Sequence, residues 1–317
     1  MGMLVEGEWK TENRLRNEEG RFVRSETSFR DRVTADGSSG FPAETGRYHL
    51  YVSWACPWAH RTAIMRRLKG LEDAISLSSV APFMGEDGWT FSDRFQDPLY
   101  GAGHLREIYT KADPDYTGRV TTPVLWDKER EIIVNNESRE VIRMLDTEFE
   151  EYVATGTDFY PESLREDIDW TIDAIYNPIN NGVYRSGFAA TQEAYDEAVT
   201  EVFDALDHWE DVLSRQRYLC GDAVTEADWC MFTTLVRFDP VYHYHFKCNL
   251  RKISDYPNLW GYLRDLYQIP GVAETVDLDH IKRHYYTSHE SVNPTRIVPK
   301  GPILDLDEPH DRARLSG

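Results

Sequence analysis

The apolar pattern of the chain changes near residue 160, and this change limits the fold more than any other feature. Between residues 46 and 150, short apolar runs typical of strands alternate with helical stretches. Between residues 160 and 290, apolar residues recur only at the three- and four-residue spacing of helices. We therefore predict an α/β domain followed by an all-α domain. An extended arm (1–45) precedes them and a tail without periodicity (291–317) follows.

The first of these domains has the pattern strand-helix-strand, then strand-strand-helix, which predicts a small mixed sheet with flanking helices. Between its halves lies an insertion, about residues 81–118, rich in aromatic residues and expected to be packed. In the second domain, Thr225 and Asp228 have the spacing of a capping box at a helix start. The predicted elements are strands at 49–52, 75–80, 122–126 and 131–134, and helices at 57–69 and from 138 to about 145.

Cys56 follows the first predicted strand, and Pro57 opens a helix directly after it. Proline suits the first turn of a helix, because its missing N–H would be unpaired there. The helix dipole and the free N–H groups at this end favour a thiolate, so Cys56 is a candidate nucleophile. The alternative is a buried structural cysteine. Ala59 stands where a Cys-x-x-Cys motif would have its second cysteine, so the predicted site is monothiol.

The four cysteines are too few and too scattered for a disulfide framework, and we interpret Cys220 and Cys230 as structural. The net charge of −20 argues against nucleic acid or an anionic membrane as a partner. No apolar run approaches the roughly 20 residues that span a bilayer. The polar N-terminus is not a signal or transit peptide of the usual kind. We therefore expect a cytoplasmic protein.

The basic residues are unevenly divided, since eight of the 35 are lysine and the other 27 are arginine. Excess acid with scarce lysine is typical of a salt-adapted surface. A genome rich in G and C would also favour arginine, and an ordinary acidic cytoplasmic protein is the third interpretation. His243 and His245 have the spacing of a metal pair on a strand. No third ligand motif is nearby, so we predict no metal.

Two short motifs suit the binding of a small thiol. A cis peptide bond is largely a proline phenomenon, which makes the Thr122–Pro123 bond a candidate; an ordinary edge-strand proline is the alternative. Glu137 and Ser138 stand at a helix start, where N–H groups and a hydroxyl form a receptor for a carboxylate. The Glu137 carboxylate can accept an ammonium group. Simple N-capping is the alternative for this pair.

Four stretches of the sequence carry a family resemblance: SWACPWAHR (53–61), GRVTTPVLWD (118–127), IVNNES (133–138) and FKCN (246–249). Together they resemble the glutathione transferase superfamily, and within it the glutathionyl-hydroquinone reductases, the xi class. The similarity extends from about Trp9 to Pro302. It implies the glutathione transferase fold, with a thioredoxin-like N-terminal domain and an all-α C-terminal domain, and a homodimer.

The resemblance also implies a reaction and a set of site residues. The Cys56 thiolate attacks the thioether sulfur of a glutathionyl-hydroquinone, Tyr184 protonates the leaving ring, and a second thiol resolves the mixed disulfide on Cys56. Tyr242 and Tyr285 hydrogen-bond to the thiolate and stabilise it. Thr122 stands where the family commonly has valine. The implied thiol-binding residues are Trp89, Arg119, Val120, Thr121, Thr122, Glu137 and Ser138, with Pro123 as a structural cis-proline.

Several alternatives stay open at this point. Either glutathione or the shorter γ-glutamylcysteine fits the glutamyl-binding motifs. A different activity on the same fold is that of an omega-like monothiol transferase, which removes glutathione from disulfides without protonating a ring. The remaining alternative is a non-catalytic binding member of the superfamily, although such members often lack the nucleophile that Cys56 provides here.

Overall fold

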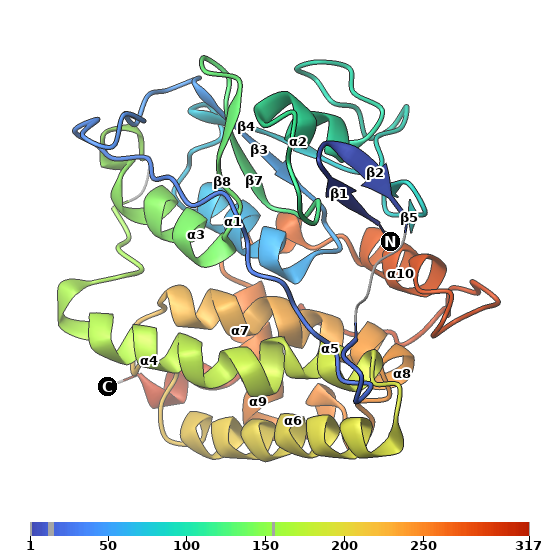
Figure 1. The fold of residues 1–317 in the computed structure, drawn as a ribbon. Coiled ribbons are helices and arrows are strands. Elements are labelled where there is room, and N and C mark those ends of the chain that lie inside the picture. The colour runs from blue at the N-terminus through green and yellow to red at the C-terminus, as the bar shows by residue number, and fades with distance from the viewer. Residues whose placement is uncertain (1, 12–15, 154–155, 317) are drawn as a thin grey trace. The chain divides into compact units, whose positions relative to one another are not determined.

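The computed structural model describes residues 2–11, 16–153 and 156–316 (Figure 1). Contacts divide these residues into two compact units. The N-terminal arm is shared between the units, and the C-terminal stretch Thr275–Ser288 belongs with the first unit. The predicted domain boundaries near 45, 150 and 160 stay predictions. The first unit is Met1–Arg14, Ser25–Thr157 and Thr275–Ser288, and the second is Leu15–Arg24, Asp158–Glu274 and His289–Gly317.

The first unit is built on a four-stranded mixed sheet of order β4-β3-β7-β8. Strand β3 pairs parallel with β4 and antiparallel with β7, and β7 pairs antiparallel with β8. Strand β7 begins two residues later than predicted, after Pro123, which has no N–H to donate to a ladder. The bounds are Tyr48–Val52 (β3), Ile75–Ser79 (β4), Val124–Asp127 (β7) and Ile132–Asn135 (β8).

Helices and the insertion cover this sheet. Helix α1 (Pro57–Leu68) joins β3 to β4, and α3 (Ser138–Thr147) follows β8 and packs beside α1 (Figure 1). All five residues of β3 are buried, as expected for a strand covered on both faces. The insertion contains β5 (Met84–Gly85), β6 (Gly88–Trp89) and α2 (Leu105–Ala112).

The insertion shares a hydrophobic core with the sheet. Trp89 and Tyr109 from the insertion belong to one buried cluster with Tyr51 and Trp126 from the strands. Asp97 fixes a loop of the insertion, because its carboxylate accepts the Tyr51 hydroxyl at 2.9 Å and the backbone N–H groups of residues 99, 100 and 102. Trp89 and Tyr109 are therefore part of the packed body of the first unit, whereas Phe83 and Tyr100 are exposed.

The N-terminal arm contains a short hairpin that the sequence pattern does not predict. Strands β1 (Met3–Val5) and β2 (Glu8–Lys10) form an antiparallel hairpin. Its turn is made by Glu6 and Gly7, both at positive φ, a conformation that glycine adopts readily. Leu4 also pairs with Gly118, so the hairpin adds to the loop before β7.

The second unit is helical and is built around α7. All twelve residues of α7 are buried. The predicted capping box is confirmed, since the Thr225 N–H donates to Asp228 Oδ2 at 2.8 Å. The helices are α4 (Arg165–Ile175), α5 (Gly182–Gly187), α6 (Gln192–Leu213), α7 (Glu226–Arg237), α8 (His243–His245) and α9 (Pro257–Tyr267), with short 3₁₀ turns at Glu162–Leu164, Ile253–Asp255 and Arg312–Leu315; α10 (Leu278–Ser288) belongs to the first unit.

Two π-helical segments extend helices of the second unit. Tyr176–Asn180 follows α4 and Phe238–Tyr242 follows α7. Each has proline at its third position, Pro178 or Pro240. A proline inside a helix removes one donor and clashes with the carbonyl four residues before it, so the regular α-helical ladder cannot continue. The Asn181 N–H instead bonds to the Tyr176 carbonyl, five residues back, at 2.8 Å.

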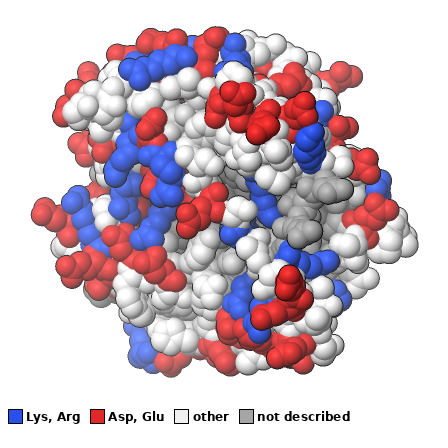
Figure 2. Space-filling model, viewed as in Figure 1, with Lys and Arg blue, Asp and Glu red and all other residues white. Residues whose placement is uncertain are grey.

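The tail is tied to the second unit by the buried side chain of Arg312. Its guanidinium donates to the carbonyls of Leu213, Gln216 and Arg217, at 2.6, 2.7 and 2.7 Å, just past the end of α6. No described helix is both long and apolar enough to cross a membrane. Acidic side chains are spread over the face shown in Figure 2, interspersed with basic groups, of which the largest lies on the left of the view.

Candidate active site

Cys56 occupies the N-cap position of α1, as the strand–Cys–Pro pattern predicts. Its backbone is extended (φ −75°, ψ 118°), and Pro57 is the first residue of the helix. The thiol is partly exposed, and its Sγ lies 3.4 Å from the Thr122 carbonyl oxygen. A small thiol compound can therefore reach this sulfur at the positive end of a helix dipole.

The peptide bond between Thr122 and Pro123 is cis, so the Thr122 carbonyl is presented to Cys56 directly before β7. The Thr122 side chain is buried, and its hydroxyl has no hydrogen-bond partner among the described residues. The arrangement suits pairing with the cysteinyl part of a thiol peptide.

The loop before the cis-proline is held by two tyrosines that the sequence analysis did not single out. The Tyr109 hydroxyl donates to the Thr121 carbonyl at 2.9 Å and accepts the Thr121 N–H at 3.1 Å. It also accepts the amide of Asn136 at 3.2 Å, which links this loop to the start of α3. Burial raises the pKa of Tyr109 to about 12. Tyr116 donates to the Arg119 carbonyl at 3.2 Å.

Glu137 and Ser138 stand at the N-terminus of α3. Glu137 is the N-cap residue, and its carboxylate accepts the Arg139 N–H at 3.3 Å and the Thr27 hydroxyl at 3.2 Å. A carboxylate has about four lone-pair sites, so capping leaves room for an ammonium group. Ser138 is the first helical residue and is buried. N-capping and ligand binding can therefore coexist here.

Arg61 adds a positive charge beside Ser138 that the sequence analysis missed. Its Nη1 donates to Ser138 Oγ at 3.4 Å, and its guanidinium lies 4.5 Å from the ring centroid of Trp58. The arginine is buried on α1, one turn after Cys56. The residues around Arg61 give no sign of this contact, because its partner Ser138 lies 77 residues further along the chain.

Two other predicted site residues of the first unit lie near α10. Trp89, on β6, stacks on His284 with ring centroids 4.8 Å apart. His284 Nδ1 lies 2.8 Å from the Pro82 carbonyl oxygen, which fixes α10 to the insertion. Tyr285 is the next residue and is almost fully buried. Arg119 and Val120 lie in the loop held by Tyr116 and Tyr109, beside Thr121.

Tyr184 and Tyr242 belong to the second unit, where their ring centroids lie 6.0 Å apart. Tyr184 is on α5, two residues after the first helical position, and Tyr242 ends the second π segment. Tyr242 is fully buried, whereas Tyr184 is partly exposed. Phe246 packs against both, at 5.4 and 5.5 Å, and Phe22 from the arm stacks on Tyr184 at 6.3 Å. The two tyrosines are predicted from the sequence, whereas their packing against Phe246 and Phe22 is not.

His243 and His245 lie in the short helix α8 and not on a strand. Side chains two apart on a helix do not face each other. His245 Nε2 instead lies 3.1 Å from His289 Nδ1. Within residues 2–11, 16–153 and 156–316, no group of three or more His, Cys, Asp or Glu side chains is placed to hold a metal ion.

Comparison with known proteins accounts for this arrangement. The family model described as the glutathione S-transferase N-terminal domain matches residues 55–148, and that of the C-terminal domain matches residues 192–265. Glutathionyl-hydroquinone reductase YqjG of Escherichia coli is 54% identical over 323 residues, covering 98% of each chain. The chain belongs to the glutathionyl-hydroquinone reductases, the Xi class of glutathione transferases.

Solved structures of Xi-class relatives have the same fold. The Xi-class transferase of Natrialba magadii is 58% identical, with a TM-score of 0.95 over 100% of this chain and 98% of that one. The glutathione-bound structure of YqjG from E. coli K-12 is 53% identical, with a TM-score of 0.91 over 98% of this chain and 99% of that one. The predicted family and the predicted glutathione transferase fold are both confirmed.

Proposed function

We propose that this chain reduces glutathionyl-hydroquinones to free hydroquinones, with Cys56 as nucleophile and a small thiol as co-substrate. The observation that carries the proposal is the partly exposed Cys56 sulfur at the N-terminus of α1, 3.4 Å from the carbonyl oxygen of Thr122. Nearly full-length relatives at 54% and 53% identity are glutathionyl-hydroquinone reductases, which supports the same activity here.

The first half of the reaction breaks a carbon–sulfur bond. The Cys56 thiolate attacks the thioether sulfur and forms a sulfur–sulfur bond, while the electron pair of the carbon–sulfur bond stays with the aromatic ring. Tyr184 gives its phenolic proton to that ring carbon and regains a proton from solvent. The ring leaves as free hydroquinone. Tyr242 and Tyr285 stabilise the thiolate before attack.

The second half restores the enzyme. A second thiol attacks the mixed disulfide, the Cys56 thiolate leaves, and a small-molecule disulfide is released. The conjugate is thus reduced by two electrons, and two thiol equivalents, one of them from the conjugate itself, are oxidised. No metal takes part in any step.

The thiol is held at its two ends by the groups already described. Backbone groups of Thr122, with the loop of Arg119 to Thr121, pair with the cysteinyl part, and Trp89 covers it. Glu137 accepts the ammonium of the γ-glutamyl end, and the Ser138 hydroxyl with the first N–H groups of α3 binds its carboxylate. Arg61 supports this end by holding Ser138.

The test is the steady-state release of hydroquinone from a glutathionyl-hydroquinone with excess glutathione. Cys56→Ala should abolish release, and Cys220→Ala is the matched control, because Cys220 is also a partly buried free cysteine. Tyr184→Phe should lower kcat by about 10²- to 10⁴-fold, the usual contribution of a general acid. A wild-type enzyme that releases no hydroquinone, at low or molar salt, would contradict the proposal.

The same assay separates the alternative functions. An omega-like transferase would exchange glutathione from a mixed disulfide through Cys56 without needing Tyr184, since sulfur leaves without ring protonation. Tyr184→Phe should therefore spare disulfide exchange while it impairs ring release. A protein inactive in both reactions would be a binding member of the family.

γ-Glutamylcysteine is the second candidate thiol, because every group assigned above binds the γ-glutamyl or cysteinyl part. The acidic, lysine-poor composition motivates its association with a salt-adapted host. Turnover with conjugates of the two thiols, compared at equal concentration, identifies the preferred one. A tenfold preference for the glutathionyl conjugate would contradict γ-glutamylcysteine as the physiological thiol.

Two further properties are proposed from the class to which the chain belongs. We propose a homodimer, which sedimentation equilibrium tests directly; a mass near the 36.8 kDa of one chain would contradict it. We also propose a cytoplasmic location, in keeping with the need for a reduced thiol pool. Fractionation of the source cells tests this location.

A further inference from the structure

An arginine of the N-terminal arm lies over the ring of Tyr184. The Arg24 guanidinium carbon is 5.1 Å from the centroid of that ring and 5.4 Å from the centroid of Phe22. Its Nε donates to Asn181 Oδ1 at 2.9 Å. Asn181 directly follows the first π segment and lies three residues before Tyr184. The arm thus places one fixed cation against the face of the residue that we propose as proton donor.

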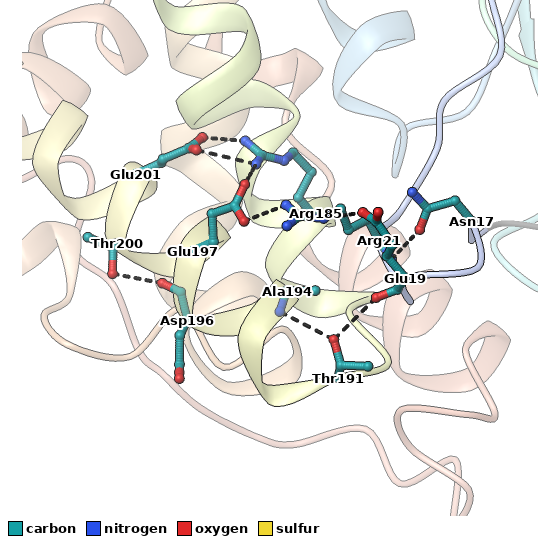
Figure 3. A network of polar contacts seen from close by, with 10 residues as sticks. All are labelled: Asn17, Glu19, Arg21, Arg185, Thr191, Ala194, Asp196, Glu197, Thr200 and Glu201. Atoms are coloured by element: carbon teal, nitrogen blue, oxygen red, sulfur yellow. Dashed lines mark hydrogen bonds and ion pairs between the residues drawn. The ribbon is translucent and has the colours of Figure 1, made fainter.

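The arm segment that carries Arg24 is held by a shared acidic side chain (Figure 3). Glu197, on α6, forms ion pairs with Arg21 from the arm and with Arg185 from α5. Arg185 also pairs with Glu201, one turn further along α6. Because Arg185 directly follows Tyr184 in α5, one carboxylate joins the arm to the helix that carries Tyr184.

Backbone contacts hold the same segment in register. The Ala190 N–H donates to the Gly20 carbonyl at 3.0 Å, and the Thr191 hydroxyl donates to the Glu19 carbonyl at 3.3 Å. Within the arm, the Arg21 N–H donates to Asn17 Oδ1 at 2.9 Å (Figure 3). These bonds fix the backbone on both sides of Arg21, and Arg24 follows only three residues later.

We propose that Arg24 is a positioning residue for proton transfer by Tyr184, an inference that rests on the proposed function. As the phenolic proton moves to the ring carbon of the substrate, the Tyr184 ring and oxygen gain negative charge. A guanidinium over the ring face stabilises this developing phenolate more than it stabilises the neutral phenol. Asn181 holds the guanidinium of Arg24, and the ion pairs of Glu197 hold the arm segment that carries it. The cation therefore does not have to move during the reaction.

The test compares two reactions of the same enzyme. Hydroquinone release needs both Cys56 and Tyr184, whereas exchange of a glutathione mixed disulfide needs only Cys56. Arg24→Gln removes the charge and keeps an amide able to bond to Asn181. It should lower kcat for hydroquinone release by about five- to tenfold, the scale of a partly desolvated cation–π contact. KM for the conjugate and the rate of disulfide exchange should stay within about twofold.

The matched control is Arg251→Gln. Arg251 also lies in the second unit, with its guanidinium carbon 4.6 Å from the ring centroid of Tyr256, and pairs with Asp207. It should leave both reactions unchanged. Arg24→Lys keeps the charge and should restore most of kcat. If Arg24→Gln does not fold, Asn181→Ala, which removes only the side chain that fixes the guanidinium, should produce the same selective loss.

Each outcome decides the inference. Equal hydroquinone release by wild type and Arg24→Gln would overturn it, and so would equal losses in the two reactions, because a structural role would impair both. Failure of Arg24→Lys to recover activity above Arg24→Gln would also count against a role for the charge. Absence of hydroquinone release in wild type is a different result, which contradicts the proposed function itself.

Discussion

His49, on the strand before Cys56, should make the free energy of unfolding depend on pH. It is buried in the middle of the sheet, with Nδ1 2.8 Å from Ser76 Oγ and Nε2 2.8 Å from Ser78 Oγ. Burial disfavours the charged imidazolium and lowers the pKa of His49 from 6.5 to about 4 in the folded protein. The unfolded chain keeps the ordinary value.

The direction in which stability changes with pH follows from the protons that the folded and unfolded states bind. Above pH 6.5 the imidazole is neutral in both states, and the folded protein carries no penalty. As the pH falls from 6.5 to about 4, the unfolded chain binds a proton that the folded protein does not, so the free energy of unfolding falls. With about 1.36 kcal/mol for each pKa unit, the full loss is about 3 kcal/mol, and the loss between pH 7 and pH 5 is about 2 kcal/mol.

The assay is urea unfolding at pH 7, 6 and 5, followed by tryptophan fluorescence. His49→Gln offers both serines a donor or an acceptor and does not titrate in this range. Its loss of unfolding free energy between pH 7 and pH 5 should be about 2 kcal/mol smaller than that of wild type. His208→Gln, which removes an exposed histidine, is the control and should follow wild type. Parallel curves for His49→Gln and wild type would refute the reasoning.

Three further predictions concern single side chains. Thr122→Val removes a buried hydroxyl without a described partner, so it should raise the free energy of unfolding by about 1 kcal/mol in the absence of thiol; a lower Tm in thermal scans would contradict this. Ser138→Ala should raise the KM for the thiol about tenfold with kcat nearly unchanged, and an unaltered KM in steady-state assays would exclude Ser138 from thiol binding. Arg312→Gln loses charged donors to three carbonyls and should cost about 3 kcal/mol in urea unfolding, whereas a loss below about 1 kcal/mol would show that the tail is not stabilising.

The sequence predicts the elements of the fold because their causes are local. Pro57 begins α1 through its missing N–H, and the pairing of Thr225 with Asp228 begins α7 through a reciprocal cap three residues long. Strand β7 is displaced by two residues because Pro123 cannot donate to the ladder. The grouping of α10 with the first unit has no such local cause, since its apolar spacing is that of any amphipathic helix.

The candidate site is predicted only where a motif carries it. Cys56, Pro123 and Glu137 stand in short stretches whose residue types alone indicate a thiol site. Tyr109 and Arg24 do not, because a buried tyrosine in a helix and a charged residue in an arm are ordinary features. Their importance comes from partners 12 and 157 residues away, Thr121 and Asn181, which only the folded chain brings together.

The two π segments let the second unit hold a proline inside each of two helical stretches. Each π turn holds about one residue more than an α turn for the same rotation. The wide turn takes up this extra residue, so α5 follows α4 without a loop although Pro178 lies between them. A rule that ends every helix before a proline would therefore divide both helical stretches at the wrong place.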